Sequence, residues 1–256
     1  MNIKESVFEC KRGEFFVRGT EFRPEGENLP AAIICHGFMA NQESVKVYAK
    51  ALAETGYITY CFDFCGGSAA ENKSDGVTTE MSVLTEALDL EAVIAYVKSL
   101  PYTGDKLLVG GCSQGGFVSA LVAARNPGLI NKLLLVYPAL CIPHDARSGK
   151  MMFAEFDPQN IPEIVPCGPM TLGRCYVADV VGMDVYEAIS GYTGEVGLIH
   201  GDSDALVDIS FSDKAFEVYR KTASSAEYCV IKGGEHGFKD EYEERAIRFI
   251  KGFAAL

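Results

Sequence analysis

The chain has 256 residues, 48% of them hydrophobic, which is enough for one large domain with a sizeable buried core. Its 35 acidic residues outnumber 23 basic ones and give a formal charge of -12, which argues against binding to nucleic acid or to polyanionic substrates. No apolar run reaches the length of a membrane span, and the start of the chain has no apolar signal region, so we expect a cytoplasmic protein without a membrane partner.

Nine cysteines are scattered along the chain, without a Cys-x-x-Cys pair or a His/Cys spacing typical of zinc sites. Several lie within apolar runs, such as Cys35 and Cys61. A free buried cysteine behaves as a small hydrophobic residue. We therefore expect reduced thiols, no bound metal and no cofactor.

The first half of the chain alternates between strand and helix patterns. Residues 5–23 predict two antiparallel strands that meet at a turn near 11–14. The elements expected next are a strand at 31–36, a helix at 44–54, a strand at 57–62, a Gly- and Ser-rich loop at 63–79, a helix at 81–99, a strand at 106–110, a helix ending near 125 and a strand at 132–137. This alternation is typical of an α/β fold with a doubly wound, mostly parallel sheet.

The helix at 81–99 has an amphipathic pattern. The residues expected on its buried face are Val83, Leu84, Ala87, Leu88, Val93, Ile94 and Val97.

The alternation breaks between Pro138 and Thr193, where five further prolines and several aromatic residues occur. The segment is too long for a bare loop in a compact domain. A strand at 195–200, a helix at 210–222, a strand at 227–231 and a helix at 242–253 then resume the pattern. We expect residues 1–139 and 191–256 to form the core, and 140–190 to be an insertion that acts as a lid over the active site.

The sequence Gly-Cys-Ser-Gln-Gly-Gly at 111–116 joins a predicted strand to a predicted helix. A Gly-x-Ser-x-Gly motif in that place is a nucleophile elbow, in which a tight turn exposes the serine hydroxyl at the top of the sheet. Ser113 is therefore the predicted nucleophile. Cys112 beside it is expected to pack under the elbow rather than to react.

A serine nucleophile needs a base and an acid that orients the base. His236, in the Gly-rich loop after the last predicted strand, is the candidate base, and Asp204, after the preceding strand, is the candidate acid. Asp202 and Asp208 compete with Asp204, but Asp202 is better suited to bind turn backbone. The order Ser, Asp, His along the chain agrees with an α/β-hydrolase.

The other histidines have structural explanations. His36 and His200 each end an apolar strand, where a histidine commonly bonds to nearby loop backbone. His144 falls in the insertion and is expected to be exposed or part of the lid.

An oxyanion hole requires backbone N–H donors where negative charge develops. The N–H of Gln114, directly after the nucleophile, is one expected donor, and it also opens the elbow helix. The N–H of Phe38, in the His-Gly-Phe turn after the strand at 31–36, is the other.

From about Glu14 to the C-terminus the chain resembles the α/β-hydrolase superfamily. The resemblance rests on His-Gly-Phe at 36–38, the elbow, His-Gly-Asp-x-Asp-x-x-Val at 200–207 and Glu-His-Gly-Phe at 235–238. Within the insertion, residues 156–162, 171–176 and 184–187 resemble those of bacterial cinnamoyl (feruloyl) esterases. Such enzymes cleave esters of ferulic, p-coumaric and caffeic acids without a cofactor.

The resemblance implies that Asp145 and Tyr176 offer polar groups to the ring hydroxyls of the substrate; the alternatives are a solvated loop aspartate and a core tyrosine. One departure is Met151-Met152-Phe153, which stands near the lid tip where a polar amide is expected. A more apolar lid would accept plain aryl or short acyl esters.

The expected function is thus a serine carboxylesterase acting on small-molecule hydroxycinnamate esters. The alternatives are a general short-chain carboxylesterase, an acylglycerol lipase or a serine peptidase on the same triad, and a catalytically silent ligand-binding protein. A homodimer is the assembly that we consider for this chain.

Overall fold

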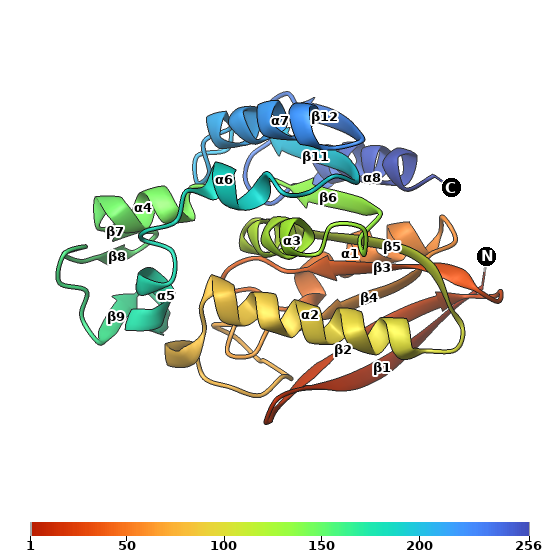
Figure 1. Cartoon of the computed structure of the whole chain (residues 1–256), viewed down its shortest axis with the longest axis horizontal. Helices are drawn as coiled ribbons and strands as arrows, with labels where there is room; N and C mark the ends of the chain where they lie inside the picture. Colours follow the sequence, from red (N-terminus) through yellow and green to blue (C-terminus); the bar gives the residue numbers. More distant parts are fainter. Residues whose placement is uncertain (1, 256) are drawn as a thin grey trace.

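The computed structural model describes residues 2–255 and has one large sheet at its centre (Figure 1). Within that range the sheet has eight strands in the order β1-β2-β4-β3-β5-β6-β11-β12. β1 pairs with β2 and β2 with β4 in antiparallel fashion, and every later pair is parallel. The strands are β1 (Ile3–Arg12), β2 (Phe15–Pro24), β3 (Leu29–Cys35), β4 (Ile58–Phe62), β5 (Thr103–Cys112), β6 (Lys132–Val136), β11 (Glu195–Gly201) and β12 (Ser225–Ile231). The predicted α/β-hydrolase type of sheet is confirmed.

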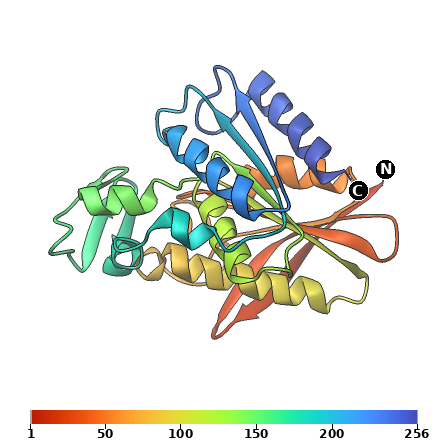
Figure 2. The same cartoon turned by 45° about the horizontal axis from the view of Figure 1, so that its top comes forward.

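Helices cover both faces of the sheet (Figure 2). On one face α2 (Val83–Ser99), α3 (Gln114–Arg125) and α7 (Ser210–Thr222) bury their apolar residues in the larger core cluster. On the other face α1 (Lys46–Ala53) and α8 (Asp240–Ala254) contact each other and form a second cluster with the sheet. The core elements expected from the sequence are all present, with ends that differ by a few residues.

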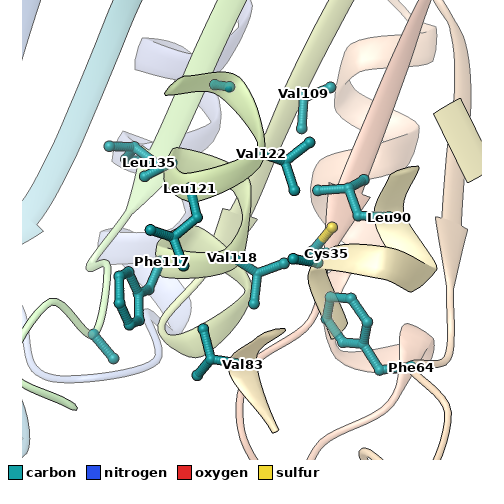
Figure 3. Packing of buried hydrophobic residues seen from close by; sticks show 14 of the residues in the cluster. Cys35, Phe64, Val83, Leu90, Val109, Phe117, Val118, Leu121, Val122 and Leu135 are labelled. Atoms are coloured by element: carbon teal, nitrogen blue, oxygen red, sulfur yellow. The ribbon is translucent and has the colours of Figure 1, made fainter. Parts of the chain in front are cut away.

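Alternation along the central strands feeds both clusters. In β3, Ile33 and Cys35 point to the α2 and α3 side, whereas Ala32 and Ile34 point to the α1 and α8 side. None of these four residues is more than 1% exposed. Figure 3 shows Cys35 beside Val118 of α3, in the middle of the packed layer between sheet and helices.

The buried face of α2 differs from the one expected. Leu88, predicted to be buried, is 48% exposed, while Glu86 and Asp89 are buried. Each of these acids has a partner: Asp89 pairs with Arg12 at 2.6 Å, and Glu86 accepts a hydrogen bond from Gln114. A purely apolar pattern fails here because paired carboxyl groups take positions on the core side.

The segment 140–190 contains short elements, most of which lie beyond the carboxyl ends of the parallel strands on the left of Figure 1, while its last helix lies nearer the middle of the view. They are α4 (Ile142–Ser148), β7 (Lys150–Met151), β8 (Ala154–Glu155), β9 (Ile164–Cys167), β10 (Met170–Gly173), α5 (Arg174–Ala178) and α6 (Val185–Ile189). The strands form two antiparallel hairpins, β7–β8 and β9–β10. α6 packs against α3 and α7.

Several side-chain hydrogen bonds join this segment to the residues just before α2 and at its start. Thr78, in the 3₁₀ turn η2 (Thr78–Glu80), donates to the carbonyl of Thr171, and Ser82 donates to the carboxylate of Asp179, each at 2.5 Å. The insertion is therefore anchored on the loop before α2 as well as through its own two ends. None of the helices within residues 2–255 combines the length and the hydropathy needed to cross a lipid bilayer.

Candidate active site

Ser113 occupies a sharp turn between β5 and α3. Its φ of 51° and ψ of -121° lie outside the regions that a residue with a side chain usually adopts. Neighbouring backbone holds this conformation, since the Ser113 N–H donates to the carbonyl of Val136 at 3.0 Å and its carbonyl accepts from Ala139 at 2.9 Å. Hydrogen bonds with the end of β6 and with the residues just after it thus hold the elbow in place.

Glycines make the turn sterically feasible. A Cβ on Gly115 would overlap the carbonyl oxygens of His36 and Cys35 at the end of β3. A Cβ on Gly111 would overlap the backbone of Gly115 across the turn. The strand and the helix can approach this closely only with hydrogen at both positions.

The three residues of the predicted triad lie together at the carboxyl edge of the sheet. His236 Nε2 is 3.0 Å from Ser113 Oγ, and His236 Nδ1 is 2.7 Å from Asp204 Oδ2. An ionised carboxylate can only accept, so Nδ1 carries the proton and Nε2 is free to accept the serine hydroxyl proton. This is the hydrogen-bonded arrangement that a general base requires.

A second histidine, His200, also binds Asp204. Its Nε2 lies 3.0 Å from Asp204 Oδ2 and 3.1 Å from the carbonyl oxygen of Val207. A carbonyl only accepts, so Nε2 carries the proton, and Nδ1 accepts from the hydroxyl of Ser212 at 2.7 Å. The predicted bond to loop backbone is present, but the contact with the acid was not predicted from the sequence.

The Asp204 carboxylate is held in its ionised form. Burial on its own would raise its pKa, but hydrogen bonds from the two imidazoles and from the N–H of Val207 outweigh this effect and hold the pKa well below its usual range. The side chain has no exposed surface. Asp204 therefore stays charged at any pH at which the protein is expected to work.

The competing aspartates are engaged elsewhere. Asp202 Oδ1 accepts from the N–H of Gly233 at 2.6 Å, the turn-backbone contact expected of it. Asp208 Oδ1 accepts from the N–H of Ser210 at the start of α7. The geometry therefore favours Asp204 as the partner of the imidazole.

The remaining histidines have the expected surroundings. His36 is buried, which lowers its pKa, and its Nδ1 donates to the carbonyl of Gly37 while Nε2 accepts from the N–H of Phe64. It thereby links the loops after β3 and β4. His144 is exposed on the insertion, with its ring 5.8 Å from that of Phe211.

The two predicted oxyanion donors belong to turns on either side of Ser113. A Cβ on Gly37 would lie 3.0 Å from the Cβ of Ser113, so the turn before Phe38 packs directly on the serine. Gln114 begins α3. Phe38 and Gln114 both line the cavity into which Ser113 opens.

That cavity has a volume of about 490 Å³ and extends from Ser113 and His236 into the insertion. Asp145 of α4 and Tyr176 of α5 both line it, so the structure brings them to the same site. Most of the remaining lining is apolar or contains sulfur: Met39, Ala139, Cys141, Ile142, Met151, Met152, Cys167, Leu172, Ala205, Leu206 and Val207.

Asp145 and Tyr176 differ in their surroundings. The Tyr176 side chain is buried, its hydroxyl donates to Gln114 Oε1 at 2.5 Å, and its ring lies 5.3 Å from that of Phe38. The Asp145 side chain is 35% exposed and has the ring of His144 at 3.4 Å. Tyr176 is thus fixed beside the elbow, whereas Asp145 retains access to water.

The apolar residues 151–153, near the tip of the insertion, lie in two different environments. Met151 and Met152 line the cavity, whereas Phe153 is 64% exposed and lies against Gly168. Cys112 is buried under the elbow as expected, and burial raises the pKa of its thiol to about 12. A thiol that stays protonated is no nucleophile at neutral pH.

No group of three or more His, Cys, Asp or Glu side chains within residues 2–255 is arranged to hold a metal ion.

Comparison with known proteins agrees with this geometry. Residues 27–174, more than half of the chain, match the family described as serine aminopeptidase, S33. The chain belongs to this family. It is a serine hydrolase of the α/β-hydrolase type, as the sequence motifs predict. No curated protein sequence matches this hydrolase.

Solved structures of similar hydrolases cover nearly the whole chain. Est1E from Butyrivibrio proteoclasticus with ferulic acid bound is 27% identical, with a TM-score of 0.87 over 96% of this chain and 97% of that one. A second structure of Est1E is 25% identical, with a TM-score of 0.85 over 96% of each chain. The Pyrococcus furiosus esterase Pf2001, 20% identical with a TM-score of 0.70 over 98% and 93%, shares the fold.

Proposed function

We propose that this hydrolase is a serine carboxylesterase that cleaves esters of hydroxycinnamic acids through an acyl-enzyme. The observation that carries the proposal is one continuous cavity that joins Ser113 and His236 to Asp145 and Tyr176. A serine, a base and a pocket for an aromatic acyl group are the parts that this reaction needs.

In the proposed acylation step, Ser113 Oγ attacks the ester carbonyl carbon while His236 Nε2 takes the hydroxyl proton. Asp204 holds the imidazole in the required tautomer and stabilises the imidazolium. The carbonyl oxygen becomes an oxyanion that the N–H groups of Phe38 and Gln114 stabilise. The imidazolium then protonates the departing alcohol as the C–O bond breaks.

Deacylation repeats these roles with water. His236 removes a proton from a water molecule that attacks the acyl carbon, and a second oxyanion forms at the same N–H groups. Its collapse breaks the bond to Ser113 Oγ, which regains a proton from His236. The free acid leaves and the serine is restored.

The insertion supports the choice of acyl group. The cavity wall is mainly apolar, which suits an aromatic ring and its unsaturated linker. Asp145 offers carboxylate oxygens, and Tyr176, whose own proton is donated to Gln114, offers a lone pair, so both are acceptors for phenolic hydroxyl groups. The likeness to Est1E, a structure of which contains ferulic acid, points the same way.

A second candidate function follows from Met151 and Met152. Both line the cavity, where they offer no hydrogen bond of useful strength to a ring substituent. A pocket with this wall also suits unsubstituted aryl or short acyl chains. The second candidate is therefore a general short-chain carboxylesterase that uses the same triad.

The test compares initial rates of hydrolysis of methyl ferulate and p-nitrophenyl butyrate by the wild-type protein and by Ser113→Ala. We expect turnover of both esters, and a loss on the order of 10⁶-fold in the variant, because a triad without its nucleophile retains only residual catalysis. Turnover of the butyrate alone would support the short-chain esterase instead.

Two outcomes would contradict the serine mechanism itself. One is a loss of less than about tenfold in Ser113→Ala, since removal of a nucleophile costs far more than that. The other is failure of a fluorophosphonate probe to label Ser113, which would favour a silent ligand-binding protein. Hydrolysis of peptides or of long-chain acylglycerols in preference to both esters would assign the triad to a peptidase or a lipase.

A further inference from the structure

The core beneath the elbow contains a carboxyl group that takes no part in the triad. Glu86, in the first turns of α2, is 1% exposed. Its Oε2 accepts a hydrogen bond from Gln114 Nε2 at 2.8 Å. A buried carboxyl group is costly, so its direct contact with the residue after the nucleophile calls for an explanation.

Gln114 is bonded at both ends of its amide. While Nε2 donates to Glu86, Oε1 accepts from the hydroxyl of Tyr176 at 2.5 Å. All three side chains are buried. A single amide thus connects α2, the start of α3 and the insertion helix α5.

The surroundings of Glu86 favour its neutral form. Burial is the main cause that raises its pKa well above the usual value, and the nearby carboxyl of Asp89 adds to the effect. Cys35 of β3 and Tyr176 of α5 also face it, and neither can carry positive charge. The guanidinium of Arg12 is paired with Asp89.

We propose that Glu86 is a positioning residue of the active site, which through the Gln114 amide holds the oxyanion turn and Tyr176 of the insertion as one unit. The backbone N–H of Gln114 is the proposed oxyanion donor, so restraint of its side chain restrains the donor. A neutral carboxyl gives this support without placing negative charge beside the developing oxyanion.

Loss of Glu86 would leave the buried Gln114 NH₂ group with only a weak acceptor, the thioether sulfur of Met81 at 3.9 Å. The amide would then rotate or admit water, because an unpaired buried donor is expensive. Either change would also disturb its bond to Tyr176. The expected damage is therefore to the placement of the oxyanion donor, and so mainly to turnover.

The experiment measures kcat and KM on p-nitrophenyl butyrate for Glu86→Leu and Glu86→Gln, with rates normalised to the end-point fluorophosphonate titre. We expect kcat to fall at least about tenfold in Glu86→Leu with little change in KM, as loss of an acceptor for a buried donor implies. Glu86→Gln keeps a neutral acceptor, so we expect it to retain most of the activity.

Leu90→Ala is the matched control. Leu90 lies one turn further along α2 (Figure 3), is fully buried, and has an aliphatic side chain that cannot hydrogen-bond to the Gln114 amide. We expect this variant to lose stability but to keep kcat per labelled site. If Glu86→Leu has the same kcat per labelled site as Leu90→Ala, the positioning role is overturned.

A double-mutant cycle tests the connection to the insertion. If Glu86 and Tyr176 act through one amide, the combination of Glu86→Leu with Tyr176→Phe lowers kcat/KM by less than the product of the single effects. Agreement with that product within about twofold, the range for independent sites, would contradict the proposal.

The proposal rests on Ser113 as the nucleophile and does not depend on the cinnamoyl specificity. Because the assay uses p-nitrophenyl butyrate, it can succeed even if methyl ferulate is no substrate. Failure of the wild-type protein to react with the fluorophosphonate would count against the proposed serine mechanism, whereas a normal titre with unaltered Glu86→Leu kinetics would count against Glu86 alone.

Discussion

The carboxylate of Asp204 uses all of its hydrogen-bonding capacity. Oδ1 accepts from the N–H groups of Leu206 and Val207, both at 2.9 Å, and Oδ2 accepts from His200 and His236. A carboxylate has about four lone-pair sites, so no site remains for water. Its position, and with it the orientation of the His236 imidazole, is fixed from four directions.

His200 should therefore affect turnover although it lies outside the triad. We predict that His200→Phe, which keeps a ring but removes the donor, lowers kcat on p-nitrophenyl butyrate by about ten- to a hundredfold, as expected for a hydrogen bond to a charged group. Ser212→Ala should have a smaller effect, because it removes only the donor to His200 Nδ1, while Asp204 and the carbonyl of Val207 still hold the proton on Nε2.

His144→Phe serves as the comparison, because His144 is an exposed histidine on the insertion. We expect its kcat on the same ester to equal that of the wild-type protein. A His200→Phe variant that is folded and fully active would show that Asp204 needs only its backbone donors and His236.

The main residues of the site were predictable because each follows a strand in a short motif. Ser113, Asp204 and His236 lie after β5, β11 and β12, and parallel strands bring their carboxyl ends to one edge. The contact of His200 with Ser212 was not predictable, since it depends on how α7 packs against β11. The link from Glu86 to Gln114 likewise joins positions that no local pattern relates.

At the level of elements, the elbow depends on how closely β5, β3 and α3 approach. We predict that Gly115→Ala destabilises the protein by about 1–3 kcal/mol or more, because its Cβ would overlap backbone oxygens of β3 that cannot move independently. Urea unfolding followed by circular dichroism measures the change.

Gly252→Ala is the control within the same chain. Gly252 lies in α8 with nothing within 4 Å of an added Cβ. There the same substitution should stabilise the protein by up to about 1 kcal/mol, through better helix propensity. If Gly115→Ala and Gly252→Ala changed the free energy of unfolding equally, the steric explanation of the elbow would be contradicted.

The short elements of the insertion could not be predicted from the sequence. Its strands have two to four residues, too few for a period-of-two pattern to be recognised. The prolines of this segment disfavour long helices, but they do not indicate the two hairpins. In α2 the helix itself was predictable, but its buried face was not, because Glu86 and Asp89 occupy core positions through their partners.

Over the whole molecule, all nine cysteines are free, and seven are buried. Burial is the main cause that raises the pKa of the two half-buried thiols, Cys175 and Cys229. We predict that a bulky thiol reagent at neutral pH reacts slowly with these two in the native protein and with all nine after unfolding.

Single substitutions to serine at Cys175 and at Cys229 should each lower by one the number of thiols that react in the native protein. Rapid native reaction at the buried thiols, for example Cys35 or Cys61, would mean that the core opens on the timescale of the assay. The number of thiols that react after unfolding, measured by absorbance in denaturant, serves as the internal reference.

Part of the cavity lining can change shape. Met39, Met151 and Met152 line it, and an unbranched thioether with three rotatable bonds adapts to differently shaped partners at little cost. Tyr176, by contrast, is held by its bond to Gln114. From this combination we expect an enzyme that recognises one common polar feature of its substrates and accepts variety in the rest.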